Sequence, residues 1–294
     1  MSLPSKSFQV PVRGGDLHVV LYGDGVGDPV MLIHGITSSN RAFQIFADSL
    51  IARGKAPYAV DLRGRGLSRD LPGPYGMRQH AEDVAAAITI LNLIKPDVIG
   101  HSMGGFIVAV LYKLFPNLVG DVVFADGGIP LPLPPGVTIE QAMAAILGPA
   151  LDRLSMTFKS KEEYREFLKS KPSYIKGWTS VHDEYADYDL KGAAPYFQPA
   201  TSREAVAEDS KDTFDSATIV ADGLKALAKE SLFLRAPRGL QNEEGGLYPK
   251  AVLDNFLPLY PNLKLVELED VNHYDMFLGD GAEQVAQVIY GARK

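Results

Sequence analysis

The chain has 294 residues, 46% of them hydrophobic, and this favours one globular domain with an insertion over two independent domains. It contains no cysteine, so disulfide bonds and thiolate chemistry are excluded. A net charge of -7 argues against nucleic acid or an anionic membrane as a partner. Because residues 1–6 form no apolar signal and no run is long enough to span a bilayer, we expect a cytoplasmic protein.

The first half of the chain alternates short apolar runs with helical patterns. Two strands joined at Gly14-Gly15 are predicted first, followed by further strands and two longer helices. The strands are predicted at residues 8–12, 17–22, 30–33, 59–60, 98–99 and 122–124, and the helices at 77–93 and 103–114. This alternation is typical of an α/β fold with a mostly parallel, doubly wound sheet.

The alternation stops after Asp126. Residues 127–136 are too rich in proline and glycine for regular structure. Helices are then predicted from Thr138, over 161–168 behind the capping-box pair Ser160 and Glu163, and near 202–210, with no strand between them. Strands return at 232–234 and 263–268, and a helix is predicted at 282–292. We therefore predict a core of residues 1–128 and 217–294, with a helical cap of residues 129–216 inserted after the sixth strand.

The segment Gly100-His101-Ser102-Met103-Gly104 lies between a predicted strand and a predicted helix. That context is typical of a nucleophile elbow, where glycines flank the serine because a Cβ would clash on so sharp a turn. Ser102 needs a base to take its proton, and an imidazole suits that role near neutral pH. His273 is the best candidate because it follows the last predicted strand.

The other five histidines are interpreted as structural. His18 and His80 fall in a strand and a helix without visible chemical partners. His101 is expected to pack behind the elbow, and His182, in the cap, could also contact substrate.

These segments, together with His34-Gly35 and the stretch from Asp61 to Ser68, resemble the α/β-hydrolase superfamily, and in particular capped serine hydrolases of the esterase or lactonase kind. The resemblance extends over residues 9–289. It implies Ser102 as nucleophile, His273 as base and the backbone N–H groups of Ile36 and Met103 as the oxyanion hole. It also implies that His34 orients its loop, and that no metal or organic cofactor takes part.

Two further features of the sequence involve acidic residues: the turn that begins at Asp61 and the carboxylate that would complete the triad. Asp61 and Arg63 are interpreted as a structural ion pair within a turn. Gly239 stands where many relatives carry the triad acid. Asp126, at the end of the sixth strand, is therefore the predicted acid, and Glu243 on the loop after the 232–234 strand is the main alternative, with Glu244 behind it.

The cap is rich in aromatic residues, and Trp178 and Tyr188 are predicted to bind substrate, although such rings also attach a cap to its core. The predicted activity is hydrolysis of a carboxylic ester or lactone of a small apolar or aromatic molecule. Carbon–carbon bond hydrolysis or acyl transfer by the same residues, and a hydrolase-like receptor for a small molecule, are the alternatives. The sequence does not determine the oligomeric state.

Overall fold

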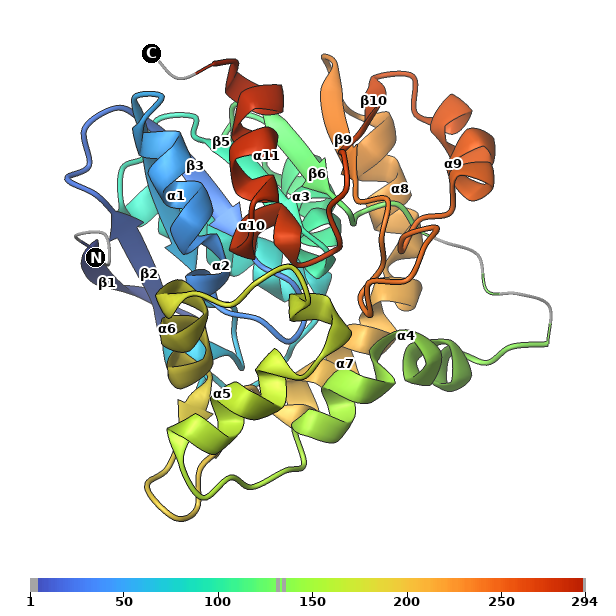
Figure 1. Cartoon of the computed structure of the whole chain (residues 1–294). Helices are drawn as coiled ribbons and strands as arrows, with labels where there is room; N and C mark the ends of the chain where they lie inside the picture. Colours follow the sequence, from blue (N-terminus) through green and yellow to red (C-terminus); the bar gives the residue numbers. More distant parts are fainter. Residues whose placement is uncertain (1–4, 131–132, 134–135, 293–294) are drawn as a thin grey trace.

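A mostly parallel eight-stranded sheet forms the centre of the computed structural model, which describes residues 5–130, 133 and 136–292 (Figure 1). The strand order is β1-β2-β4-β3-β5-β6-β9-β10, in which β1–β2 and β2–β4 pair antiparallel and the later pairs are parallel. The strands are β1 (Ser5–Val12), β2 (Gly15–Tyr22), β3 (Asp28–Ile33), β4 (Lys55–Val60), β5 (Asp97–His101), β6 (Val122–Ala125), β9 (Ser231–Arg235) and β10 (Leu263–Glu267). The predicted fold class is confirmed.

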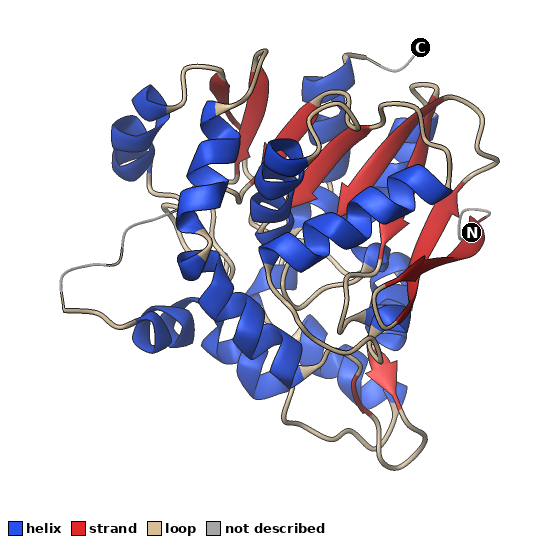
Figure 2. Ribbon diagram, turned by 180° about the vertical axis from the view of Figure 1, so that it is seen from behind, coloured by secondary structure: helices blue, strands red, loops and turns tan. Residues whose placement is uncertain are grey.

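Helices cover both faces of the sheet, because successive side chains of each strand point to opposite faces. In β3, Val30 and Leu32 pack against α1 (Gln44–Ile51) and α11 (Gly281–Tyr290). Met31 and Ile33 belong instead to the larger cluster with α2 (Met77–Ile90), α3 (Met103–Leu114) and α8 (Ala217–Lys225). Figure 2 shows these three helices on the face opposite to α1 and α11. Both faces of the sheet are therefore buried.

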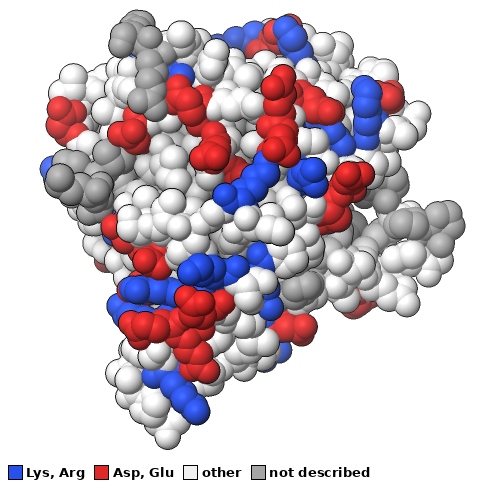
Figure 3. All heavy atoms as spheres, in the orientation of Figure 1, with Lys and Arg blue, Asp and Glu red and all other residues white. Residues whose placement is uncertain are grey.

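Shorter helical elements lie between the strands and long helices of the core. They are η1 (Asn40–Phe43), η2 (Gly66–Ser68), α9 (Lys250–Phe256), η4 (Leu257–Leu259) and α10 (Asp275–Leu278). Within the described residues, no helix is both long and apolar enough to cross a lipid bilayer. On the face drawn in Figure 3, acidic and basic side chains are interspersed.

The cap lies between β6 and β9, beyond the carboxyl ends of the strands (Figure 1). We call α4–α7 the cap helices: α4 (Ile139–Arg153), α5 (Lys161–Lys169), α6 (Ser180–Tyr188) and α7 (Arg203–Asp215), with η3 (Pro172–Tyr174) between α5 and α6. A short antiparallel pair, β7 (Leu190–Lys191) and β8 (Gln198–Pro199), lies among them, so the expectation of no strand between the cap helices is wrong.

The N-termini of the cap helices show how local sequence sets their bounds. Thr138 and Gln141 form a full capping box at α4. At α5, Ser160 accepts the N–H of Glu163, but the Glu163 carboxylate accepts the N–H of Lys159 instead of that of the N-cap residue. The box predicted at Ser160 is therefore formed on one side only.

A buried cluster of charged groups attaches α7 to the core. The Asp209 carboxylate accepts hydrogen bonds from Arg65 Nη1 at 2.5 Å and lies 3.0 Å from His80 Nε2. All three side chains are fully buried. His80, expected to have no chemical partner, thus contacts a carboxylate that is 129 residues away in the chain.

A second cluster, of hydrogen-bonded polar side chains, attaches α6 to the core. Tyr188 Oη donates to Asp61, which also accepts hydrogen bonds from Asn40 and contacts His18 Nδ1 at 2.9 Å. Arg63 pairs with Asp83 at 2.9 Å. The predicted Asp61–Arg63 ion pair is therefore wrong, because each partner is matched by a residue from another element, and the expectation that His18 lacks a partner is wrong as well.

Asp209→Asn is expected to lower the free energy of unfolding by about 3–5 kcal/mol, because it leaves the buried guanidinium of Arg65 without a counter-charge. Burial raises the pKa of Asp209, but His80 and Arg65 outweigh it and hold the pKa below its ordinary value. A carboxyl group with a lowered folded-state pKa stabilises the fold above its unfolded pKa of about 4, and this contribution is lost as the pH falls.

Urea unfolding near neutral pH measures the change. Asp215→Asn is the matched control, since Asp215 lies on the same helix but has a half-exposed side chain that pairs only with Lys211 among the described residues. We expect the control to stay within about 0.5 kcal/mol of the wild type. Equal losses in the two variants would contradict a special role for the buried cluster.

Candidate active site

Ser102 lies at the sharp turn between β5 and α3, with φ of 55° and ψ of -121°. A non-glycine residue in this left-handed region is strained by about 1–3 kcal/mol, and such strain is typical of functional positions. A Cβ at Gly100 would lie 2.2 Å from Gly104 O, and one at Gly104 would lie 2.2 Å from Ile33 O. The elbow therefore requires glycine on both sides of the serine, as the motif suggested.

His273 and Asp126 form a buried hydrogen-bonded pair. His273 lies on the loop after β10, and its Nδ1 is 2.7 Å from Asp126 Oδ2. Asp126 follows β6 directly, and its Oδ1 accepts the N–H of Ala236 at 3.2 Å. Because the carboxylate accepts the proton on Nδ1, Nε2 of His273 is left with a free lone pair.

The two alternative acids, Glu243 and Glu244, form no hydrogen bond to His273 within the described part of the chain. The Glu243 carboxylate accepts the N–H of Gln241 at 2.7 Å, within its own loop. Glu244 is exposed, and its described contact is a backbone bridge to Arg238. Of the carboxylates considered from the sequence, Asp126 is therefore the one that contacts the imidazole.

Ser102 and His273 line the same small cavity of about 20 Å³, which also includes Gly35, Ile36 and Thr37. Among the described residues, no hydrogen bond joins the Ser102 hydroxyl to the imidazole. Such bonds are often long without substrate and shorten in the substrate complex. The structure thus places the Ser102 hydroxyl and the His273 imidazole at one cavity, with the Asp126 carboxylate behind the imidazole.

The backbone N–H groups of Ile36 and Met103 border this site. Met103 is the first residue of α3, so its N–H has no acceptor within the helix. Neither N–H donates to another described residue, and both residues line a cavity together with Ser102. Two free donors beside a nucleophile suit a developing oxyanion.

Two core side chains hold the loop that carries Ile36. His34 Nε2 accepts the N–H of Leu62 at 3.0 Å, so its proton is on Nδ1, which donates to Gly35 O at 2.7 Å. Burial lowers the pKa of His34 to about 4, and the ring is therefore neutral at neutral pH. Arg65 Nε donates to Ile36 O at 2.9 Å. The interpretation that His34 orients this loop agrees with these contacts.

His101 supports the loop of the base. Its Nε2 lies 2.9 Å from His273 O, and the centroids of the two imidazole rings are 4.5 Å apart. Burial, together with the nearby His273, holds the pKa of His101 well below its ordinary value. A neutral His101 therefore donates from Nε2 to the backbone of His273. The sequence placed this residue behind the elbow but did not reveal that contact.

The two cap residues predicted to bind substrate do not reach the cavity at Ser102. Trp178 donates its indole N–H to Asp183 at 2.8 Å, and its ring is tilted against that of His182 with the centroids 5.2 Å apart. Tyr188 is occupied by Asp61 and by Asn40 Nδ2. Both rings are directed toward polar partners within the protein. These positions therefore give no support to the prediction that Trp178 and Tyr188 bind substrate.

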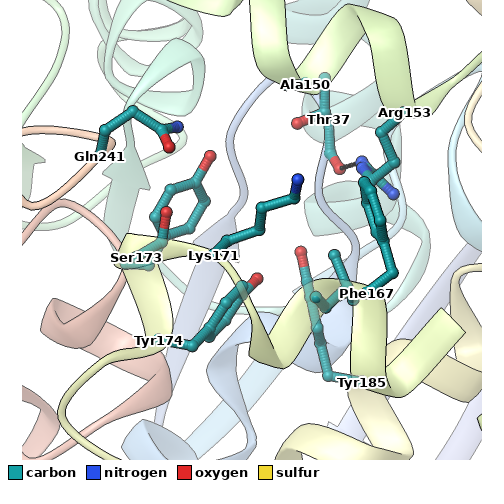
Figure 4. A pocket seen from close by; sticks show the side chains of 11 residues that line it. Thr37, Ala150, Arg153, Phe167, Lys171, Ser173, Tyr174, Tyr185 and Gln241 are labelled. Atoms are coloured by element: carbon teal, nitrogen blue, oxygen red, sulfur yellow. Dashed lines mark hydrogen bonds between the residues drawn. The ribbon is translucent and has the colours of Figure 1, made fainter.

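Two further cavities adjoin the one at Ser102. The first, the apolar chamber, has a volume of about 120 Å³ and shares Ile36, Ser102 and Leu147 with the small cavity. Its other lining residues include Met103, Phe106, Met143, Phe214 and Leu247. The second, of about 50 Å³, shares Thr37 and Tyr274 with the small cavity and extends into the cap (Figure 4). These lining residues come from segments far apart in sequence, so no local pattern indicated them.

A profile of the alpha/beta hydrolase family matches residues 30–288. The chain is 25% identical over 268 residues to a 2-(acetamidomethylene)succinate hydrolase of Mesorhizobium japonicum, covering 85% of this chain and 83% of that protein. It is 30% identical over 128 residues to a serine hydrolase-like protein of Danio rerio, but that match spans 43% of this chain and only 39% of the relative.

Solved structures share the fold. A crystal structure of E-2-(acetamidomethylene)succinate hydrolase superposes with a TM-score of 0.76 at 22% identity, covering 97% of this chain and 98% of that one. A thermophilic esterase from Thermogutta terrifontis, with malate bound, superposes with a TM-score of 0.67 at 19% identity, covering 97% and 96%.

Proposed function

The chain belongs to the alpha/beta hydrolase family, and from this premise we propose that it is a serine hydrolase that cleaves a carboxylic ester or lactone through an acyl-enzyme. The observation that carries the proposal is the buried Asp126–His273 pair beside the strained elbow of Ser102. A pair of this kind orients an imidazole for proton transfer.

In the proposed reaction, Ser102 Oγ attacks the substrate carbonyl carbon while its proton passes to His273 Nε2. The N–H groups of Ile36 and Met103 stabilise the negative charge that develops on the carbonyl oxygen. The C–O bond to the alcohol then breaks, and the departing oxygen takes the proton from the imidazolium. Water attacks the acyl carbon next, with His273 again as base, and the acid leaves as Ser102 regains its proton.

The proposal is tested by turnover. A panel of p-nitrophenyl esters and lactones of increasing size is expected to be hydrolysed well above the rate of the buffer alone. Saturable binding of the same compounds without turnover would instead identify a hydrolase-like receptor and would contradict the proposed activity.

A further inference from the structure

The second cavity, which we call the tyrosine–lysine chamber, contains an unmatched positive charge. Its lining includes Arg153, Lys171, Tyr174, Tyr185 and Tyr274, and no aspartate or glutamate is among the described lining residues. Figure 4 shows the Lys171 side chain extending between the other lining residues, with its ammonium group in the middle of the view.

The charges of the two basic residues are matched differently. Arg153 donates to Asp189 and Tyr164, and its Nη2 reaches Thr37 O at 3.2 Å. Lys171 forms no ion pair in the described part of the chain, and its ammonium lies 4.0 Å from the centroid of the Phe167 ring. The chamber therefore has an excess of one positive charge, on Lys171.

Neutral hydroxyl donors accompany this charge. Burial raises the pKa of both Tyr174 and Tyr274, so both phenols are protonated at neutral pH. Neither hydroxyl has a hydrogen-bond partner among the described residues. The carboxylate of Glu243, which adds to the rise of the Tyr274 pKa, is held by the N–H of Gln241. A cation with protonated phenols nearby favours an anion that accepts several hydrogen bonds.

The chamber adjoins the proposed catalytic cavity. Tyr274 follows His273 in the chain and lines both cavities, and Thr37 follows Ile36 and does the same. The apolar chamber opens on another side of Ser102. A molecule with its carbonyl at Ser102 can therefore place a charged group on one side and a hydrocarbon group on the other.

We propose that the substrate carries a carboxylate, which the Lys171 ammonium and the hydroxyl groups of Tyr174 and Tyr274 bind, while its apolar part fills the apolar chamber. This inference rests on the proposed hydrolase function and names its substrate class. A carboxylate is favoured over a phosphate dianion because a single unmatched cation balances a single negative charge.

Matched ester pairs test the inference. Phenyl esters of succinic, glutaric and adipic acid that keep a free carboxylate are compared with the same esters carrying a carboxamide, and a second set places the carboxylate on the alcohol side. We expect kcat/KM to favour the acid over its amide by tenfold or more in at least one pair. Lys171→Met is expected to reduce this preference to about unity, because it lowers kcat/KM for the acid far more than for the amide.

Two further variants make the test specific. Lys169→Met is the matched control, since Lys169 lies at the end of α5 and pairs with Glu166 on the surface. It is expected to keep the preference for the acid. Tyr174→Phe is expected to reduce the preference by a smaller factor than Lys171→Met. A preference for the acid that survives in Lys171→Met, or no preference in the wild type, would overturn the inference.

Binding to Ser102→Ala separates this inference from the proposed function. If calorimetry shows Lys171-dependent binding of the acid over the amide but the wild type hydrolyses neither, the carboxylate site stands and the hydrolase function fails. If neutral esters are hydrolysed without any preference for the acid, the function stands and the carboxylate site fails. Tighter binding of a phosphorylated analogue than of the acid would refute the assignment to a carboxylate.

Discussion

Ser102→Ala is expected to lower kcat for an activated ester by about 10⁶-fold, because loss of the nucleophile disables a Ser-His-Asp triad as a unit. The oxyanion donors at Ile36 and Met103 remain, so about 10³–10⁴-fold acceleration over the uncatalysed reaction is expected to persist. A fluorophosphonate probe should add its mass to the wild-type peptide that contains Ser102 and leave the variant unlabelled.

Ser38→Ala is the control for this experiment. Ser38 lines the same small cavity as Ser102, and its hydroxyl lies 3.3 Å from Tyr185 Oη. The control removes a hydroxyl at the site while retaining the nucleophile, so labelling and turnover are expected to stay within a few fold of the wild type. Probe mass that remains on the Ser102→Ala protein would show that another residue is the nucleophile.

Asp126→Asn is expected to lower kcat by about 10⁴-fold with little change in stability. The amide cannot hold the His273 tautomer that leaves Nε2 free, and it does not stabilise the imidazolium that forms during attack. The substitution suits the backbone, since Asp126 has a φ of 47° and asparagine tolerates this left-handed region. Its side-chain oxygen can still accept the N–H of Ala236.

Glu243→Gln is the matched comparison, because it makes the same chemical change at the other acid that the sequence suggested. The Glu243 carboxylate bonds the backbone of its own loop, so kcat is expected to stay within a few fold of the wild type. Both variants are measured after their thermal unfolding has been compared. Normal turnover in Asp126→Asn with a large loss in Glu243→Gln would move the triad acid to the loop after β9.

The proposed site illustrates which features of a chain can be predicted locally. Ser102, Asp126 and His273 each follow a strand of a parallel sheet, and the carboxyl ends of such strands lie along one edge. Their chain order and the glycines around Ser102 were enough to bring them together in a hypothesis. The choice between Asp126 and Glu243 was not local, because it depended on which carboxylate the fold brings within 2.7 Å of the imidazole.

The roles of the cap side chains depended even more on tertiary structure. Cap composition suggested Trp178 and Tyr188 as substrate contacts, whereas packing directs them to Asp183 and Asp61. Lys171, whose chamber adjoins the proposed catalytic cavity, was not among the residues that the sequence singled out. Its significance follows from the absence of an acidic side chain among the described lining residues of its chamber.

The sequence by itself therefore predicted the eight strands of the main sheet, the core helices α2, α3 and α11, and the strand–turn–helix context of the elbow at Ser102. Hydrophobic periodicity, capping residues and glycine at strained turns act over a few residues, so they are visible in the chain. The tertiary structure decided which distant groups meet: His80 with Asp209, Tyr188 with Asp61, and His273 with Asp126 rather than with Glu243. Such contacts join residues that can be more than 100 positions apart, and they exist only because sheet order and cap docking bring those residues into one space.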